Sequence, residues 1–457
     1  KVMQTRILVP TGVLGMGFDQ AALEAGIKRA PDAICVDGGS TDSGPFYLGT
    51  ATSKYARSTS KADWRRLMLA RQQASVPLII GSCGTCGADA TVDWMYEITC
   101  ELAEELGQSL IIARLYSEQD LSNLKIAFDT GRITALPAAP DLTAASFTSM
   151  SHAVALAGAE QIGAALDSGA DIILAGRTTD TATIAALPLK RGAHNGAAWH
   201  GAKVAECGAF CSTHPGTGVV LVDFDETGFT IEAMAKEASC TPHSVSAHML
   251  YENVDPFILY EPGGHLDVTA ARYQALPRGR VRVEGAIWHP TEHYCVKLEA
   301  TTIGGYQTSM MAILRDGRYV EKAAHWAESL VSFCHQKIQS SMLLLPQDYS
   351  LECRLIGLNA ALGDLETSAS ADAHEIGVLV MITAKNQETA TDISKIINPY
   401  LLHHPLSASE DLPTFAFPYS PAHSERGILH EFALNHVLEL ESPMAAFRLN
   451  ISEICFG

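Results

Sequence analysis

Residues 79–89 read IIGSCGTCGAD, and the first half of the chain is organised around this stretch. Its apolar start predicts the end of a buried strand, and the spacing of Trp94, Ile98 and Leu102 predicts a helix that begins near Asp89. Between them lies a glycine-rich loop with two thiols. Because open α/β sheets bind ligands at the carboxyl ends of their strands, we expect this loop to form one wall of a binding site.

The same succession of apolar strand, glycine-rich loop and helix recurs through residues 1–198. We expect strands over residues 6–10, 33–37, 76–82, 110–115 and 170–175, and helices over residues 19–27, 61–73, 121–128 and 151–165. Near-continuous apolar strands that alternate with helices are typical of parallel sheets covered on both faces. The sequence therefore predicts an α/β fold, with a mostly parallel sheet and helices on both faces. A closed eightfold barrel would need more units.

The pattern changes near Trp199, where polar glycine loops replace the regular alternation. Residues 219–223 and 229–234 predict a hairpin, and a long helix is predicted over residues 318–338. After it we expect strands over residues 350–358, 376–384 and 446–454, a helix over residues 387–402 and a loop over residues 403–429. We therefore expect a parallel α/β domain (1–198), a mixed α+β extension that completes the site (199–316) and a C-terminal α+β domain (317–457).

The composition is that of a globular, acidic protein. Of the 457 residues, 47% are hydrophobic and 18% are charged, and the formal net charge is −19. This charge disfavours nucleic acids and anionic membranes as partners. The eleven cysteines lack the regular spacing of a disulfide framework. Neither a signal-peptide pattern nor an apolar run of 18 residues is present, so we expect a cytoplasmic protein, and we expect it to form a homo-oligomer.

Two aspartates lie near the carboxyl end of the second predicted strand. Asp37 ends the strand and Asp42 lies five residues further on, with Gly38 and Gly39 between them. Such aspartates either cap turns or take part in a site. The turn after the first strand, which contains Gly12, has the spacing G-x-x-G-x-G and not the G-x-G-x-x-G of dinucleotide folds. We expect this turn to hold an anion other than NAD.

Cys83 and Cys86 form a C-x-x-C pair within the glycine-rich loop. With Cys207 and Cys211 they are one possible structural zinc site, although the second pair has a different spacing. A redox pair and a nucleophilic thiol are further alternatives. The remaining alternative is a pair of small buried thiols beside the site.

Glu261, His265 and Asp267 lie in a polar loop around Gly264. Carboxylates and an imidazole this close in sequence suit either a divalent metal or general acid–base catalysis. The glycines argue against a helix, so the three side chains need not share one face. The structural alternative is a turn in which Asp267 caps a helix that begins near Val268.

Arg177 follows the fifth predicted strand, and Thr178 and Asp180 come next, at the start of a predicted helix. A guanidinium beside a helix N-terminus binds a carboxylate or phosphate through two parallel hydrogen bonds. The alternative is an ion pair between Arg177 and Asp180. We therefore treat this segment as the predicted anion anchor.

Four of these motifs carry a resemblance to a known family. They are DGG at 37–39, the glycine loop at 81–87, AGRTTD at 175–180 and EPGG at 261–264. Together with the tail that contains Asn435, His436 and Arg448, they resemble the acyclic terpene utilisation, or AtuA-like, family. The resemblance covers most of the chain and implies a role in the catabolism of carboxylic acids or acyl-CoA thioesters. It implies no catalytic role for any single residue.

We expect an enzyme that acts on a small carboxylic acid or acyl-CoA as a lyase, hydratase or isomerase, by moving a proton next to a carboxylate. The G-x-S-x-G, Walker and H-E-x-x-H motifs of hydrolases, NTPases and metalloproteases do not occur in the sequence. The candidate catalytic residues are Asp37, Asp42, Cys83, Cys86, Asp89, Glu261 and His265. The candidate substrate-binding residues are Gly12, Gly38, Gly39, Ser82, Gly84, Arg177, Thr178, Asp180 and Gly264. We expect no cofactor and no bound metal. The alternative is a non-catalytic subunit that binds an acyl ligand or regulates a partner enzyme.

Overall fold

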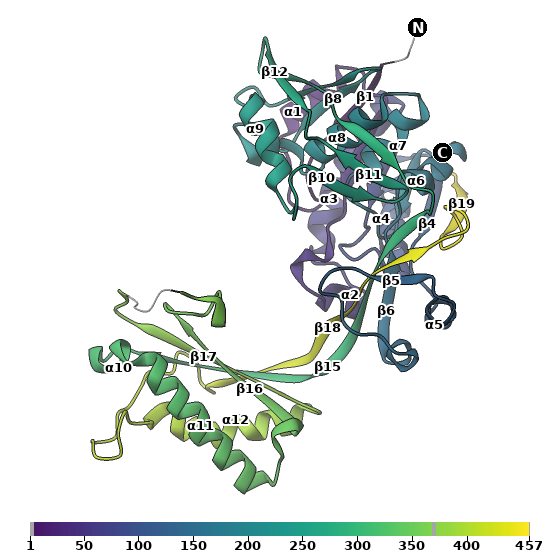
Figure 1. Ribbon diagram of the computed structural model, residues 1–457. Coiled ribbons are helices and arrows are strands. Elements are labelled where there is room, and N and C mark those ends of the chain that lie inside the picture. The colour runs from purple at the N-terminus through teal and green to yellow at the C-terminus, as the bar shows by residue number, and fades with distance from the viewer. Residues whose placement is uncertain (1–3, 368–371, 457) are drawn as a thin grey trace. The chain divides into compact units, whose positions relative to one another are not determined.

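The computed structural model describes residues 4–367 and 372–456. The chain divides into two compact units (Figure 1). The first unit comprises Lys1–Thr302 and Phe432–Gly457, and the second unit comprises Ile303–Glu431. The chain passes from the first unit to the second within strand β15 (Cys295–Leu314) and returns within strand β18 (His423–Glu439). Within the described residues, no helix combines the length and the apolar character needed to cross a membrane.

The five predicted strands form the centre of the main sheet of the first unit. They are β1 (Thr5–Val9), β2 (Ala33–Asp37), β3 (Leu78–Gly81), β4 (Leu110–Tyr116) and β7 (Ile172–Ala175). They pair in parallel in the order β1-β2-β3-β7-β4. Every residue of β3 and β7 is buried, as expected for strands covered on both faces. The predicted α/β class is therefore confirmed.

Antiparallel strands extend this sheet on both sides, so it is a mixed sheet and not the mostly parallel one expected. Beside β1 lie, in order, β8 (Val220–Phe224), β9 (Gly228–Ala233), β13 (Arg280–Glu284) and β12 (Arg272–Leu276). Beside β4 lies β19 (Arg448–Ile454). The hairpin of β8 and β9 is the predicted one. Because β19 pairs with β4, the last residues belong to the first unit and not to the C-terminal domain that we expected over residues 317–457.

Two groups of helices pack on this sheet. One group comprises α1 (Gln20–Ile27), α3 (Arg57–Ala74) and α4 (Asp89–Leu106), and the other comprises α6 (Ala159–Asp167), α7 (Ala182–Lys190) and α8 (Asn195–Ala205). The shorter helices α2 (Phe46–Thr50), α5 (Leu121–Asp129) and α9 (Pro242–Ala247) lie in connections. A separate small sheet is formed by β10 (Ile258–Glu261), β11 (Gly264–Asp267) and β14 (Ile287–Pro290).

The helix predicted over residues 151–165 is wrong in its first half. Met150–Ala155 forms strand β6, which pairs antiparallel with β15, and α6 begins only at Ala159. A short run of small apolar residues fits either structure, and its period does not distinguish them. The short strand β5 (Ile133–Ala135), which pairs with β18, was not predicted either.

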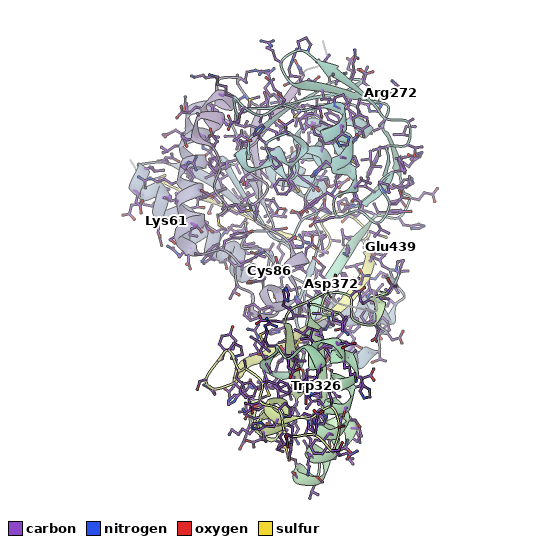
Figure 2. All side chains as sticks on the ribbon, turned by 90° about the vertical axis from the view of Figure 1, so that its left-hand side faces the viewer. Lys61, Cys86, Arg272, Trp326, Asp372 and Glu439 are labelled. Carbon is purple, nitrogen blue, oxygen red and sulfur yellow. The ribbon has the colours of Figure 1, made fainter. Side chains whose placement is uncertain are left out.

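The second unit is an α+β unit with a core of its own. Strands β16 (Tyr349–Ile356) and β17 (Ile376–Ala384) pair antiparallel, and β17 pairs with β15. Along β17 buried and partly exposed residues alternate, so one face of this sheet is covered. The helices of the unit are α10 (Gly317–Glu321), α11 (Ala323–Met342) and α12 (Gln387–His403). Trp326 of α11 is fully buried in this unit (Figure 2).

His200 of α8 is a buried, neutral histidine in the core of the first unit. Its ring packs edge-on against Phe229 and Tyr273, and its Nε2 lies 3.2 Å from the Tyr273 hydroxyl. Burial lowers the pKa of His200 to about 3. Since an unfolded histidine has a pKa of about 6.5, this group contributes stability that is fully present above that pH and is lost as the pH falls towards 3.

We expect the free energy of unfolding of the wild type to fall by about 2–3 kcal/mol between about pH 7.5 and pH 4.5 because of His200 alone. Urea unfolding at the two pH values measures the effect. The His200→Phe variant should show a pH dependence weaker by this amount. Replacement of the exposed His243 by alanine is the control, and an unchanged pH dependence in His200→Phe would contradict the assignment.

Candidate functional site

Two adjoining cavities lie at the carboxyl ends of β1, β2, β3 and β7, and each has a volume of about 450 Å³. The first cavity lies among the loops that follow β1, β2 and β3. The second cavity lies beside the loop after β7, the end of α8 and strand β10. Both cavities are lined by Ser40, Asp42, Asp180 and Glu252. They therefore form one cleft, which lies entirely within the first unit.

The loop after β3 is fastened to the loops on either side. Ser82 Oγ accepts hydrogen bonds from Arg177 Nη1 at 3.0 Å and from the Thr178 N–H at 3.2 Å. Gly87 has a φ of 65°, and a Cβ there would overlap the backbone of Arg177. On the other side, a Cβ on Gly38 would overlap the carbonyl oxygen of Ser82. Glycine is therefore required for these loops to pack closely, and the packing holds the wall of the cleft.

Of the five glycines predicted to bind substrate, Gly12 and Gly39 line the first cavity. The other three, Gly38, Gly84 and Gly264, are not among the described residues that line the cleft. A Cβ on any of the three would overlap a neighbouring side chain or carbonyl group. These three glycines allow close packing. From the sequence alone, a glycine that allows close packing looks the same as a glycine that lets the backbone approach a ligand.

Cys83 and Cys86 are both fully buried and neither is among the described residues that line the cleft. Burial raises the pKa of both thiols, so both are protonated at neutral pH. This argues against a catalytic thiolate at either position. The sulfur atoms of Cys83, Cys86, Cys207 and Cys211, all of them described residues, do not lie together within 4.8 Å, so the four-thiolate zinc site is not formed. Among the alternatives we considered, the pair of buried thiols beside the site fits the structure.

Two pairs of carboxyl groups share the cleft. Asp37 accepts a hydrogen bond from the Gly39 N–H at 3.1 Å, and burial together with the nearby Asp180 raises the pKa of Asp37 well above its ordinary value. Burial and the nearby Asp42 raise the pKa of Glu252. Asp37 and Asp42, both predicted as catalytic residues, are therefore brought together with two acids that complete the pairs, Asp180 and Glu252.

Arg177 is a buried arginine whose main partner is Glu299 and not Asp180. Its Nε donates to Glu299 Oε1 at 2.6 Å, whereas the closest distance between its Nη1 and Asp180 is 3.8 Å. Glu299 also accepts a hydrogen bond from Thr41. Arg177, Thr178 and Asp180 all line the second cavity. The ion pair that we weighed between Arg177 and Asp180 is therefore secondary, and its stronger partner comes from β15, far away in the sequence.

Glu261 is the most distinctive acid of the second cavity. Thr181, at the N-terminus of α7, donates a hydrogen bond to Glu261 Oε1. Glu261 Oε2 is buried and has no hydrogen-bond partner in the part of the chain that the structure describes. Burial raises the pKa of Glu261 to about 7. The hydrogen bonds from Thr181 and Thr179 and the positive charge of Lys203 lower this pKa, but burial has the larger effect. This carboxyl group is therefore poised to exchange a proton near neutral pH.

His265 and Asp267 do not join Glu261. All three lie in the hairpin of β10 and β11, but the ring of His265 stacks on His289 at 4.8 Å, and Asp267 accepts from the Thr269 N–H at 2.9 Å. Neither side chain is among the described residues that line the cleft. Asp267 caps a turn, and no helix begins at Val268. The predicted cluster of Glu261, His265 and Asp267 is therefore separated by the hairpin.

Asp89, the remaining catalytic candidate, lies outside the cleft. It begins α4, bonds to Arg448, and its N–H donates to Glu118 Oε2 at 2.8 Å. His152 Nδ1 lies 2.5 Å from the other oxygen of Glu118. These groups hold the start of α4 against β19.

The sequence did not point to Lys203 and Glu206, which lie at the end of α8 beside the second cavity, and it placed the adjacent Cys207, which lines the first cavity, only in a possible zinc site. Lys203 Nζ donates to Glu206 Oε1, and both side chains are buried. Burial raises the pKa of Glu206 to about 8 although Lys203 opposes the shift. A signal was present, because two opposite charges three residues apart end an otherwise apolar helix, and such charges are rarely buried without a purpose.

Acidic side chains outnumber basic ones in the cleft. The acids are Asp37, Asp42, Asp180, Glu206, Glu252, Asp255 and Glu261, and the bases are Lys54, Arg177 and Lys203. Arg177 and Lys203 both line the second cavity, together with Glu261. Acids outnumber bases in both cavities, with four acids and Lys54 in the first, but it is the second that combines the carboxyl group of Glu261, whose pKa is near neutral, with two positive charges.

Comparison with known proteins identifies the family of the chain. No curated protein and no solved structure matches the chain. The family model described as acyclic terpene utilisation family protein AtuA matches residues 67–422, which include the loops after β3 and β7, α8 and the hairpin of β10 and β11. The chain therefore belongs to the acyclic terpene utilisation family.

Proposed function

We propose that the protein is an enzyme that acts on a small carboxylic acid or an acyl-CoA thioester, as a lyase, hydratase or isomerase. In this proposal Glu261 takes or returns the proton on the carbon next to the carboxylate or thioester. The observation that carries the proposal is the buried Oε2 of Glu261, which has no hydrogen-bond partner among the described residues, on a carboxyl group whose pKa is raised to about 7. A general base is most effective when its pKa lies near the operating pH.

The second cavity also holds the charges that this reaction needs. When the C–H bond breaks, its proton goes to Glu261 and its electron pair moves towards the carbonyl oxygen, which becomes an enolate. Lys203 and Arg177 line the same cavity, and buried cations aimed at a developing oxyanion lower the barrier. The enolate then either expels a β-substituent, as in a lyase or hydratase, or takes a proton back at another carbon, as in an isomerase.

Solvent isotope exchange tests the proposal without knowledge of the complete reaction. The purified protein is incubated in D₂O with unsaturated di- and tricarboxylates, hydroxy acids and acyl-CoA thioesters, and exchange next to the carbonyl group is followed by NMR. We expect exchange or turnover with at least one class. Binding of a ligand with neither exchange nor turnover would favour the alternative, a non-catalytic ligand-binding subunit.

The pH profile of this activity is a second prediction. Because Glu261 acts as a base only when it is ionised, kcat/KM should rise about tenfold per pH unit at acid pH and level off above about pH 7. The measurement is a kcat/KM profile for the best substrate of the panel. A profile that levels off near pH 4 would exclude a base with a raised pKa.

A further inference from the structure

We propose that Glu206, Cys207 and His248 bind a divalent zinc ion in the wall between the two cavities. Each residue offers one ligand atom, and these three atoms lie within 4.8 Å of one another. A tetrahedral zinc ion with ordinary ligand distances of about 2.0–2.3 Å holds its ligand atoms about 3.5 Å apart, so binding would draw the three side chains together by up to about 1 Å. Of the three residues, only Cys207 belongs to a motif found in the sequence, where it was grouped with Cys211 and not with Glu206 and His248.

The three ligands come from two elements that pack together. Glu206 caps the C-terminus of α8 and Cys207 follows it, while His248 begins the short 3₁₀ helix His248–Leu250, which contacts α8. Glu206 and His248 are buried, and Cys207 is partly exposed. The site is therefore built into the fold and does not depend on a surface loop.

His248 provides a second, independent observation that points to a bound metal ion. Its side chain is only 5% exposed, and its buried Nε2 has no hydrogen-bond partner within residues 4–367 and 372–456. Its ring is held by stacking on Tyr251, with centroids 5.4 Å apart. Buried polar atoms without a partner are rare, and a metal ion bound at this nitrogen would satisfy it.

The donor set favours zinc over magnesium or calcium. A thiolate, an imidazole and a carboxylate together suit zinc, whereas the hard cations prefer oxygen ligands alone. The Cys207 thiol loses its proton to solvent when the Zn–S bond forms. Lys203 donates to Glu206 Oε1, and a ligating carboxylate is commonly oriented by a hydrogen bond of this kind. The second oxygen, Oε2, is the one that we assign to the metal.

Three protein ligands leave a fourth position for water or substrate, as in catalytic zinc sites. Cys207 lines the first cavity and Glu206 lines the second, so this position faces the cleft. The excess of carboxylates in the cleft favours the approach of a cation. The inference goes beyond the proposed function, because metal binding does not require that Glu261 act as a base.

Metal titration of the full-length protein tests the site. Protein stripped with a chelator is titrated with Zn²⁺ in competition with a chromophoric chelator, and separately with Co²⁺, whose thiolate complex absorbs in the near ultraviolet. We expect about one equivalent of Zn²⁺ and a thiolate–cobalt band. Cys207→Ser should abolish the band, and His248→Ala should weaken Zn²⁺ binding at least 100-fold. Cys100→Ser and His243→Ala, which lie outside the site, should bind as the wild type does.

The absence of saturable Zn²⁺ binding by the wild type would overturn the site. Unchanged binding by both Cys207→Ser and His248→Ala would do so as well. Thermal unfolding of the stripped proteins shows whether each variant folds, and Glu206→Gln replaces any variant that does not. Zn²⁺ binding without isotope exchange would leave the metal site in place and remove the proposed proton transfer. Isotope exchange without Zn²⁺ binding would support the proposed proton transfer and remove the metal site.

Discussion

Replacement of Glu261 by glutamine is expected to lower kcat by about 10²–10⁴-fold, the usual contribution of a positioned general base. Glutamine keeps the size of the side chain and can still accept the hydrogen bond from Thr181, so the cavity is preserved. It cannot take up a proton near neutral pH. The measurement is kcat for the best substrate, or the rate of isotope exchange, at a pH above 7.

The same variant is expected to lose activity but to gain stability above about pH 7. The folded pKa of Glu261, about 7, lies above the unfolded value of about 4.3. The stability that this group contributes is therefore fully present below about pH 4.3 and is lost as the pH rises through 7. Above pH 7 the glutamine variant should be more stable than the wild type, by about 1–3 kcal/mol.

Asp267→Asn is the matched control for Glu261→Gln, because it changes an acid of the same hairpin outside the cleft. It should leave kcat within about twofold of the wild type. Equal losses in the two variants would show that the hairpin, and not the Glu261 carboxyl group, is needed for activity. Wild-type kcat in Glu261→Gln would remove Glu261 as the base.

Replacement of Arg177 by methionine is expected to lower the free energy of unfolding by about 3–5 kcal/mol. The reason is that Glu299, whose side chain is only 9% exposed, would lose its main partner and would either stay charged without it or have to take up a proton, and both are costly. Breaking one side of a buried ion pair is costly for this reason, whereas a purely substrate-binding arginine at the mouth of a cleft would have little effect on stability. Urea unfolding measures the loss.

The double variant Arg177→Met with Glu299→Leu is the control for this pair. Replacement of both charges by apolar side chains of similar volume leaves no buried charge unpaired, so most of the lost stability should return. If the free energy of unfolding of the single variant falls by less than about 1 kcal/mol and its KM rises, the guanidinium binds the substrate and does not stabilise the fold. If the double variant is as unstable as the single one, Glu299 is not the partner that matters.

Local sequence signals predicted the centre of the fold well. The five parallel strands and β17 have apolar or alternating patterns that depend only on near neighbours. The failures came where the partner lies far away in the sequence. Residues 151–155 form a strand because β15 pairs with them, and the same small apolar residues could have extended a helix. The pairing of β8 with β1 and of β19 with β4, which makes the sheet mixed, could not be predicted for the same reason, because the partner strands lie far away in the sequence.

The residues of the site were likewise predictable where the signal is local and not where the partner lies far away in the sequence. Asp37, Arg177 and Glu261 follow or end strands, so their place at the edge of a sheet could be inferred. The role of Glu299 as partner of Arg177 could not, because β15 and β7 are brought together only by tertiary packing. His265 and Asp267 were grouped with Glu261 by closeness in sequence. The hairpin turns their side chains to other neighbours, and no pattern of spacing reveals this.

The pairing of β19 with β4 also sets an order in time. A chain is synthesised from its N-terminus, and domains begin to fold as they emerge from the ribosome. The main sheet of the first unit is completed by residues 448–454, which are made after the entire second unit. The hydrogen-bonding edge of β4 therefore stays without its partner strand while the entire second unit is translated. An unpaired strand edge is a site of aggregation, so the newly made chain is vulnerable at this edge until residues 448–454 have been made and have paired with it.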